Sequence, residues 1–492
     1  MESSAKDGGV VQRPRQWSQH LAALVANVAP LGSGMAMGWS APALPALRGE
    51  AGEQALPLPL RLSLEEGSWA SSLVPLGALL GALPAGPLAQ RFGRRSAVLA
   101  HALPVLLGWL LILFAHQVWL LYLGRVLTGL GVGANIVIVS LYCEEIAEVH
   151  VRGIIGSYLD MSTSSGLLLM YVLGAFVPYF WFTAACVAPA AATLLLFWCM
   201  PESPAFLVGR GRRDAARRAL RWLRGPAVDV QPELDALCLA AKAPDAPADA
   251  RSTGGPLLAC CSWSKPDRAT TKALVIVFGL MFFSQATGGT AFVYYTEDVF
   301  RAVNSGLPGD ICMVIVGAVS IVGTFLSIML VDRVGRRFIL ILSSICLSVS
   351  LLGFSVYAHF DGKGVDLTSW NWTPLVCLVV VMFNISFGYG PIKYFMMAEL
   401  MPTEAKGWGS SVCVCFSRIF SFTIAKEFPI MTTSLGQDVT YAIFCVFSFL
   451  GTLFIVLFVP ETKGKTREQI QQELTNKKPN QERLDKQDKS EC

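Results

Sequence analysis

A group of small polar side chains lies inside the apolar stretch at residues 282–297, which reads FFSQATGGTAFVYYTE. Ser284, Gln285, Thr287 and Thr290 contribute neutral hydroxyl and amide groups, which can donate and accept hydrogen bonds. An unpaired polar group is costly in lipid, so we expect these groups to face a ligand that presents hydroxyls of its own. This stretch is therefore predicted to form one wall of a binding site.

Three ionisable side chains, Asp160, Lys393 and Arg418, lie in other apolar stretches of the chain. An ionisable residue inside a membrane usually marks a ligand or ion pathway. In one interpretation, the three charges face water or pair with one another and leave a neutral binding site of altered shape. In the other, they select a charged ligand. Burying an unpaired charge costs several kcal/mol, so at least partial pairing is expected in both.

The sequence lacks the spacings that identify common catalytic, nucleotide-binding and metal sites. The five histidines are scattered without an HExxH motif, and there is no GxxxxGKS or GxxxxGKT loop for a phosphate. The thirteen cysteines form no set with metal-ligand spacing, and we expect free thiols rather than disulfides. We therefore expect no enzymatic activity, no ATP-driven pumping, no cofactor and no metal.

The elements that must position these side chains follow from composition. Hydrophobic residues make up 53% of the 492 residues and charged residues only 15%, against roughly 25% in a typical soluble domain. A helix that crosses ~30 Å of hydrocarbon needs about 20 mostly apolar residues. Twelve such segments can be recognised, which predicts an all-α membrane protein with twelve transmembrane helices. They span residues 20–45, 67–89, 96–115, 118–142, 154–175, 178–199, 271–296, 309–331, 338–358, 373–397, 408–430 and 437–459.

Lys and Arg in the connections give the orientation, because positive charge is retained on the cytoplasmic side. The connections after the even-numbered segments are rich in Arg, above all at residues 210–224, whereas the others hold few. Both termini are therefore predicted to be cytoplasmic, with no cleavable signal peptide before the first apolar segment. The net charge of +4 reflects this asymmetry, and no nucleic-acid partner is expected. Asn371, in an outer connection that reads Asn371-Trp372-Thr373, is a predicted glycosylation site.

An internal repeat divides the chain into two halves. QRFGRR at residues 90–95 recurs as DRVGRR at residues 332–337, EEIA at 144–147 is matched by AELMP at 398–402, and PESP at 201–204 by PETKG at 460–464. Three matching pairs in the same order predict two six-helix halves, at residues 20–204 and 271–459. A cytoplasmic tail at 1–19, a cytoplasmic linker at 205–270 with a helix at 214–224, and a second tail at 460–492 complete the predicted organisation.

The charged residues that end these repeats predict a gate. Arg and Glu at cytoplasmic helix ends can pair and hold the two halves together when the protein opens outward, and can separate when it opens inward. The alternative is that these charges only anchor the helix ends on the cytoplasmic side. The predicted gate residues are Arg91, Glu145, Arg152, Glu202, Arg333, Glu399, Lys406 and Glu461.

These repeats resemble those of the sugar porter branch of the major facilitator superfamily, and most of all those of the facilitated trehalose transporters of insects. The resemblance covers almost the whole chain, with further matches at Ser68-Trp69, at PLGALLG in residues 75–81, at Gly124-Arg125 and at Gly390-Pro391-Ile392. It implies the twelve-helix fold of that superfamily, a site near the bilayer midplane between the halves, and alternating access.

The resemblance also implies a function: facilitated diffusion of a sugar, either trehalose or a hexose, by a monomeric carrier in the plasma membrane. Its partners would be the sugar and the lipid bilayer. The alternatives are a carrier of a charged small metabolite or organic anion that uses Lys393 and Arg418, and a sugar sensor that does not transport. A channel is less consistent with the two-fold repeat.

Matching positions extend the predicted site and show where the chain departs from the family. Relatives usually have Asn where Ser320 stands and Trp where Tyr394 stands, and they have an acid at Gln90 and an Arg at Ala205. Gln285 and the Thr287-Gly288 step are retained. The predicted substrate-binding residues are Asp160, Ser284, Gln285, Thr287, Thr290, Ser320, Lys393, Tyr394 and Arg418.

The first apolar segment bears on energy coupling. Proton-linked relatives generally carry an Asp there, whereas residues 31–39 read LGSGMAMGW and hold no acid. Facilitated diffusion is therefore expected. Asp160 is the one candidate proton carrier, and we expect water to solvate it because it lies near Arg152 and the cytoplasmic surface. Gly and Pro at residues 388–391 interrupt the tenth segment and predict a hinge, and the small residues at 131–133 predict close helix packing.

Overall fold

The computed structural model describes residues 16–49, 60–148, 150–226, 228–242, 268–301, 308–402, 406–465, 469–470 and 473–474. Helices dominate this part of the chain, and no β-strand occurs within it. The first half comprises α1 (Gln16–Ala26), α2 (Val28–Gly38), α3 (Ser40–Arg48), α4 (Leu64–Phe92), α5 (Arg94–Leu113), α6 (Val118–Ile146), α7 (Arg152–Phe176), α8 (Tyr179–Ala185) and α9 (Val187–Phe197).

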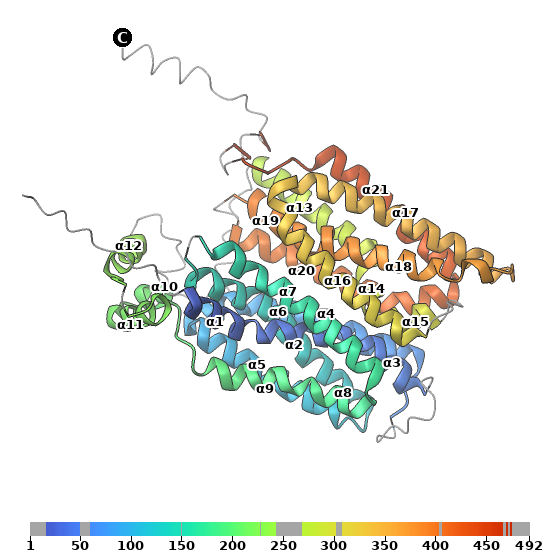
Figure 1. Ribbon diagram of the computed structural model, residues 1–492, viewed down its shortest axis with the longest axis horizontal. Coiled ribbons are helices and arrows are strands. Elements are labelled where there is room, and N and C mark those ends of the chain that lie inside the picture. The colour runs from blue at the N-terminus through green and yellow to red at the C-terminus, as the bar shows by residue number, and fades with distance from the viewer. Residues whose placement is uncertain are drawn as a thin grey trace, which may run out of the picture.

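Three short helices follow the first half: α10 (Pro204–Gly209), α11 (Arg213–Arg224) and α12 (Gln231–Lys242). The second half comprises α13 (Arg268–Ala286), α14 (Gly289–Tyr294), α15 (Thr296–Arg301), α16 (Gly309–Val334), α17 (Arg336–Gly362), η3 (Thr368–Trp370), α18 (Thr373–Asn384), the π-helix η4 (Ile385–Tyr389), α19 (Gly390–Leu400), α20 (Lys406–Ser434) and α21 (Gln437–Phe458). Figure 1 shows the two halves side by side, with α10–α12 projecting from one end, here named the linker end, and α3 and α15 at the opposite end.

Ten helical segments among the described residues are long and apolar enough to cross a membrane. The protein is therefore an integral multi-pass membrane protein. The two other predicted segments correspond to α13–α15 and to α20. The apolar part of α13 is shorter, and α20, although 29 residues long, carries Arg418, Lys426 and Glu427. The total of twelve transmembrane helices and the cytoplasmic position of both termini stay predictions.

The seventh predicted segment breaks at the polar stretch. α13 and α14 meet at Thr287 and Gly288, and Gly288 has a φ of 80°, which glycine adopts without strain. A Cβ at this position would also lie 2.6 Å from the Phe444 ring. The break brings residues on either side of it together, because Thr290 Oγ1 donates to Gln285 Oε1 at 2.7 Å.

The tenth predicted segment contains the π-helix η4 directly before Pro391 of α19. Proline has no N–H to donate and crowds the preceding turn, and a single π-turn accommodates such a site. Gly388 of η4 lies so close to α17 that a Cβ would meet Ser343 Oγ at 2.0 Å. The interruption predicted at residues 388–391 is present, and its role as a hinge stays a prediction.

Glycines join α4 to α6. Gly77 and Gly81 of α4 are four residues apart, as are Gly129 and Gly133 of α6, so each pair shares one helix face. A Cβ on Gly133 would lie 1.9 Å from the Ala78 carbonyl oxygen, and one on Gly81 would lie 2.1 Å from that of Leu130. The two backbones are therefore in direct contact, as small-xxx-small faces allow. This confirms the close packing predicted for residues 131–133.

The two halves meet where α4 packs against α20 and α7 against α16. Toward the α3 end, polar contacts join them. An Arg48 Nη donates to Asp298 Oδ2 at 2.6 Å, and Lys426 Nζ donates to Ser68 Oγ at 2.8 Å. Lys426 also lies 5.0 Å from the Trp69 ring centroid, which permits a cation–π interaction. The α3 end of the bundle is thus held closed between the halves.

The helix predicted at residues 214–224 is observed as α11. Arg224 at its end is buried and bridges to Glu233 of α12 at 2.7 Å and to Glu148 at 3.1 Å. These contacts fix α11 and α12 beneath the end of α6. The predicted domain boundaries stay predictions, and the linker residues 243–267 and most residues of both predicted tails lie outside the described residues.

Candidate functional site

Polar side chains of α13, α14 and α20 form a hydrogen-bonded group at the α13–α14 break, here named the polar network. Gln285 Nε2 donates to Ser417 Oγ at 3.2 Å, while Gln285 Oε1 accepts from Thr290. The Thr290 hydroxyl also lies 2.9 Å from Ser421 Oγ. The sequence predicted Gln285 and Thr290 but missed Ser417 and Ser421. Their spacing of four residues, which places both on one face of α20, is the signal that could have found them.

A second group lies next to the polar network and is here named the cationic cluster. Lys393 Nζ of α19 donates to Ser284 Oγ of α13 at 2.8 Å, and an Arg418 Nη of α20 donates to the Tyr394 hydroxyl at 3.1 Å. Lys393 Nζ also lies 5.3 Å from the Tyr394 ring centroid. Lys393 and Ser284 are buried, and Tyr394 and Arg418 are half-buried. Four predicted site residues from three helices thus meet at one place.

Asp160 of α7 belongs to the same cluster and comes from the other half of the protein. It is half-buried, and its carboxylate lies within electrostatic range of Lys393 and Tyr394. The expectation that water solvates Asp160 stays a prediction, because the side chain is half-buried and lies about two helical turns beyond Arg152 on α7. The partial pairing predicted for the three charges stays a prediction, since Asp160 and Lys393 form no ion pair within 4 Å among the described contacts.

Thr287 and Ser320 are buried, but their hydroxyls bond within their own chain segment. Thr287 Oγ1 donates to the Ser284 carbonyl at 3.2 Å, and Ser320 Oγ donates to that of Val316 at 3.0 Å. One turn beyond Ser320, Thr324 Oγ1 lies 2.9 Å from Ser164 Oγ of α7. The polar contact between α16 and α7 is therefore made by Thr324, which the sequence did not single out.

Arg125 of α6 is a fully buried cation that the sequence matched to the family but assigned no role. Its guanidinium donates to the carbonyl oxygens of Ala70 and Ala36, both at 3.0 Å, and to Ser40 Oγ at 2.7 Å. It also lies 4.8 Å from the Trp39 ring centroid. All of these partners are neutral, so Arg125 joins α2, α3 and α4 to α6 without an acid.

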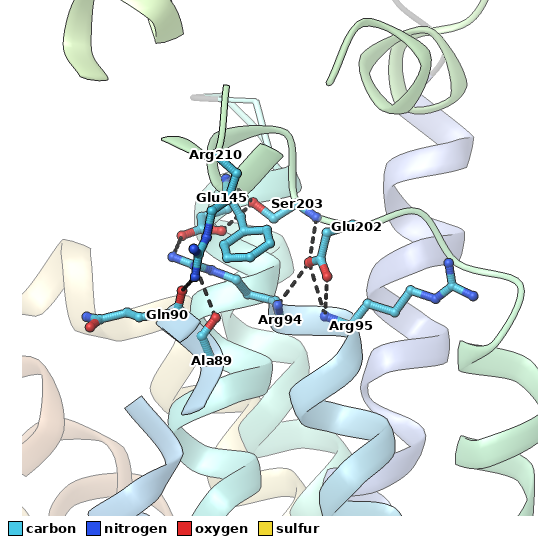
Figure 2. Close-up of polar contacts among 9 residues, drawn as sticks. Ala89, Gln90, Arg94, Arg95, Glu145, Glu202, Ser203 and Arg210 are labelled. Carbon is cyan, nitrogen blue, oxygen red and sulfur yellow. Dashed lines mark hydrogen bonds and ion pairs between the residues drawn. The ribbon is translucent and has the colours of Figure 1, made fainter. Parts of the chain in front are cut away.

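Charged residues at the linker end form one network within the first half (Figure 2). An Arg94 Nη of α5 pairs with Glu145 of α6 at 2.6 Å, and the Ser203 hydroxyl donates to the same carboxylate. Glu202 accepts from the backbone N–H groups of Arg94, at 2.9 Å, and Arg95, at 3.1 Å. A carboxylate at the N-terminus of α5 is stabilised both by these donors and by the helix dipole.

The second half repeats the two main contacts of this arrangement. An Arg336 Nη of α17 lies 3.1 Å from Glu399 of α19, and Glu461 accepts from the backbone N–H groups of Arg336 and Arg337, both at 3.1 Å. Arg336 additionally pairs with Asp332 at 2.8 Å. The corresponding position in the first half is the uncharged Gln90, so the departure seen in the sequence removes one ion pair there.

The structure brings Glu145, Glu202, Glu399 and Glu461 into these networks, as the sequence predicted. The basic partners of these glutamates are Arg94 and Arg336, not the predicted Arg91 and Arg333. The side chains of Arg91 and Arg333 are exposed. Their backbone carbonyl oxygens accept hydrogen bonds from Arg210 and Lys463, respectively. Arg152 is also exposed, and the side chain of Lys406 lies outside the described residues. Among the described residues, the contacts of each network stay within its own half.

Glycine is required at the tight turn between the two helices next to each network, at Gly93 between α4 and α5 and at Gly335 between α16 and α17. Gly93 has a φ of 101° and Gly335 a φ of 111°, which other residues adopt only with strain. A Cβ on Gly93 would lie 2.3 Å from a Glu202 carboxylate oxygen, and one on Gly335 would lie 2.9 Å from Glu461. The glycine of each repeat therefore lets the carboxylate reach the N-terminus of the next helix.

Asn371, the predicted glycosylation site, lies in the turn between η3 and α18 and is half-buried. Its modification stays a prediction. In the described part of the chain, no group of three or more His, Cys, Asp or Glu side chains is placed to hold a metal ion.

The helical arrangement defines a multi-pass membrane protein with the fold of the major facilitator type. The structure is similar to the xylose transporter XylE from E. coli in a partially occluded inward open conformation, with a TM-score of 0.73 and 21% identity over 92% of this chain and 100% of that one. It is also similar to the MFS proton:xylose symporter XylE bound to 6-bromo-6-deoxy-D-glucose, with a TM-score of 0.69, 21% identity and coverage of 92% and 98%.

Residues 48–474 match the family model of the sugar (and other) transporters, and the chain belongs to this family. It is 33% identical over 458 residues to the facilitated trehalose transporter Tret1 of Drosophila erecta and to trehalose transporter 1 of Drosophila melanogaster, covering 93% of this chain and 52% of each relative. The resemblance predicted from the sequence is confirmed. The chain spans about half the length of these curated relatives.

Proposed function

We propose that the protein is a carrier that moves a sugar, trehalose or a hexose, across the plasma membrane by facilitated diffusion through alternating access. The observation that carries this proposal is the polar network, in which Gln285, Thr290, Ser417 and Ser421 gather neutral donors and acceptors at a helix break inside the membrane-spanning bundle. Such groups can exchange their mutual hydrogen bonds for those of sugar hydroxyls. The trehalose transporters among the relatives support this substrate class. We expect a monomer.

The surroundings of Arg125 support diffusion without proton coupling. A proton-coupled site needs an acid that gains and loses a proton as the substrate moves. The described partners of Arg125 are two carbonyl oxygens and a serine hydroxyl, which cannot titrate, and Asp160 interacts with Lys393. Arg125 therefore has no carboxylate among its described partners that could exchange a proton.

Uptake by purified protein in liposomes tests the proposal. We expect saturable entry of at least one labelled sugar from a panel of trehalose, glucose, fructose and their acidic derivatives, inhibited by the same unlabelled sugar. We expect no accumulation when a proton gradient is imposed without a substrate gradient. Absence of uptake above that of empty liposomes for every sugar would contradict a carrier, and proton-driven accumulation would contradict facilitated diffusion.

The closed α3 end and the separate networks at the linker end support an inward-facing state in this structure. In the outward-facing state, we propose that the two networks approach each other across the linker end. The predicted gate residues with exposed side chains here, Arg91, Arg152 and Arg333, would then find carboxylate partners in the opposite half, and Lys406 would join them. The carboxylates are Glu145, Glu202, Glu399 and Glu461.

Exchanging the charges of Arg48 and Asp298 tests the outer closure. Arg48→Asp alone places two acids together at a contact that is now 2.6 Å and mostly buried. We expect the outward-facing population to rise about fivefold, which corresponds to ~1 kcal/mol. The measurement is the rate at which an impermeant maleimide modifies a cysteine at Ser71, which contacts Tyr295 in the closure. The double exchange Arg48→Asp with Asp298→Arg should restore the slow modification rate of the wild type. Equal rates in the wild type, the single variant and the double variant would show that the Arg48–Asp298 pair does not stabilise the closed α3 end.

A further inference from the structure

The cationic cluster presents more hydrogen-bond donors than acceptors. Lys393 carries three N–H donors, of which one reaches Ser284 at 2.8 Å. Arg418 uses an Nη group to reach Tyr394, while its Nε is buried and has no hydrogen-bond partner. Because the Tyr394 hydroxyl accepts from Arg418, its own hydrogen is free to point at another acceptor. Donors from three side chains therefore converge beside the polar network.

The charges of the cluster do not cancel. Arg418 hydrogen-bonds to Tyr394 at 3.1 Å, Lys393 lies 5.3 Å from its ring centroid, and Asp160 is the acid of the cluster, so two cations face one acid. One acid cannot neutralise both cations, and the described hydrogen bond of Arg418 goes to the neutral Tyr394 hydroxyl. A buried or half-buried cation is stabilised by an anion far more than by neutral oxygens. An anionic group seated between Lys393, Tyr394 and Arg418 would supply the missing charge.

The cationic cluster and the polar network are continuous. Ser284 of the cationic cluster is next to Gln285 of the polar network in α13. In α20, Arg418 of the cationic cluster is next to Ser417 of the polar network. One ligand a few ångströms long can therefore touch both. Its hydroxyls would face Gln285, Thr290, Ser417 and Ser421, and its anionic end would face the cationic cluster.

We propose that the sugar carried by this protein bears an acidic group, a carboxylate or a phosphate, which binds to Lys393, Tyr394 and Arg418. This inference rests on the proposed function and narrows its substrate class from trehalose or a hexose to an acidic derivative of such a sugar. Asp160 competes with that acidic group for Lys393. Asp160 belongs to the opposite half of the protein, so the ligand's acidic group takes its place beside Lys393 as the ligand enters.

The first test compares an acidic sugar with its neutral parent on the unmodified protein. Liposomes containing the purified protein are given labelled glucose or labelled glucuronate, and unlabelled glucose, glucuronate and glucose 6-phosphate are used as competitors. We expect the acidic competitors to inhibit at concentrations about tenfold lower than glucose, because hydrogen bonds to charged groups are stronger than those between neutral groups. The two acidic competitors distinguish a carboxylate from a phosphate.

Membrane potential provides an independent readout. Facilitated diffusion of glucuronate moves one negative charge, so an inside-positive diffusion potential should speed its entry, whereas entry of neutral glucose should not change. Inhibition by glucose at least as strong as that by either acidic sugar would overturn the inference while leaving the sugar carrier intact. Failure of every sugar, neutral or acidic, to enter would refute the proposed function itself and the inference with it.

Variants then test the assignment of residues. Lys393→Gln with Arg418→Gln should remove the tenfold preference for the acidic sugar, whereas Asp160→Asn should increase it, because a competitor for Lys393 is lost. Lys272→Gln, an exposed cation on α13, is the matched control and should leave the preference unchanged. A preference that survives the double substitution would overturn the assignment. If that variant does not fold, the comparison on the unmodified protein and Asp160→Asn still decide the question.

Discussion

Replacing Gln285 with Ala is expected to lower the kcat/KM of sugar uptake about 100-fold. Gln285 is 6% exposed, and its amide donates to Ser417 and accepts from Thr290 at the same time. Removing it deletes both a donor and an acceptor for the ligand and takes the amide donor from the buried Ser417 hydroxyl, while Thr290 keeps its contact with Ser421. Each buried polar group left unsatisfied costs ~1–3 kcal/mol, and about 2.7 kcal/mol corresponds to a 100-fold loss.

Initial rates of uptake into liposomes over a range of sugar concentrations measure this effect. Gln231→Ala, at an exposed amide on α12, is the control and should not change kcat/KM, while Gln285→Asn keeps an amide and should recover part of the lost activity. Size-exclusion chromatography establishes that each variant is folded. A Gln285→Ala protein that transports within threefold of the wild type would place the sugar away from the polar network.

Substituting Gly133 with Ala is expected to destabilise the first half by about 1–3 kcal/mol. The added Cβ would lie 1.9 Å from the Ala78 carbonyl oxygen and 2.8 Å from its Cα, and both are backbone atoms of α4. A flexible side chain could rotate away, but a helix backbone can only move as a whole. α4 and α6 must therefore separate along their length, which also weakens the packing of Gly81 against Leu130.

The temperature at which half of the detergent-solubilised protein aggregates measures this destabilisation. Gly156→Ala is the matched control, because a Cβ at this exposed position of α7 would meet nothing within 4 Å. It adds the same methyl group and should not lower the aggregation temperature. Equal temperatures for the two variants would show that α4 and α6 can shift apart without loss of stability.

Much of the site was predictable from residue types. The polar residues at 284–290 stand out in an apolar stretch because the membrane penalises unpaired polar groups, and Gln285 and Thr290 do bond to each other. The glutamates of the repeats were also predictable, since Glu145 and Glu399 both pair with the arginine that follows a repeat glycine. These inferences needed only composition, repetition and the physics of lipid.

The identity of the basic partner was not predictable in the same way. Arg91 and Arg94 are both in the repeat, but Gly93, with its φ of 101°, ends α4 and redirects the chain so that Arg94 begins α5. Which arginine reaches Glu145 depends on that turn. Ser417 and Ser421 were missed for a related reason, because serines are common in membrane helices and only the helix rotation shows which of them face α13.

The sequence by itself determined that this protein crosses the membrane many times, that it consists of repeated halves, and which residue types could bind a ligand, because hydropathy and repetition are properties of the chain alone. The tertiary structure decided which of those residues meet. Lys393 and Ser284 are 109 residues apart, and Arg48 and Asp298 are 250 apart. Such contacts depend on how each helix is rotated and on where its axis breaks, as at Gly288. Packing between helices sets these quantities, and the periodicity of one helix does not contain them.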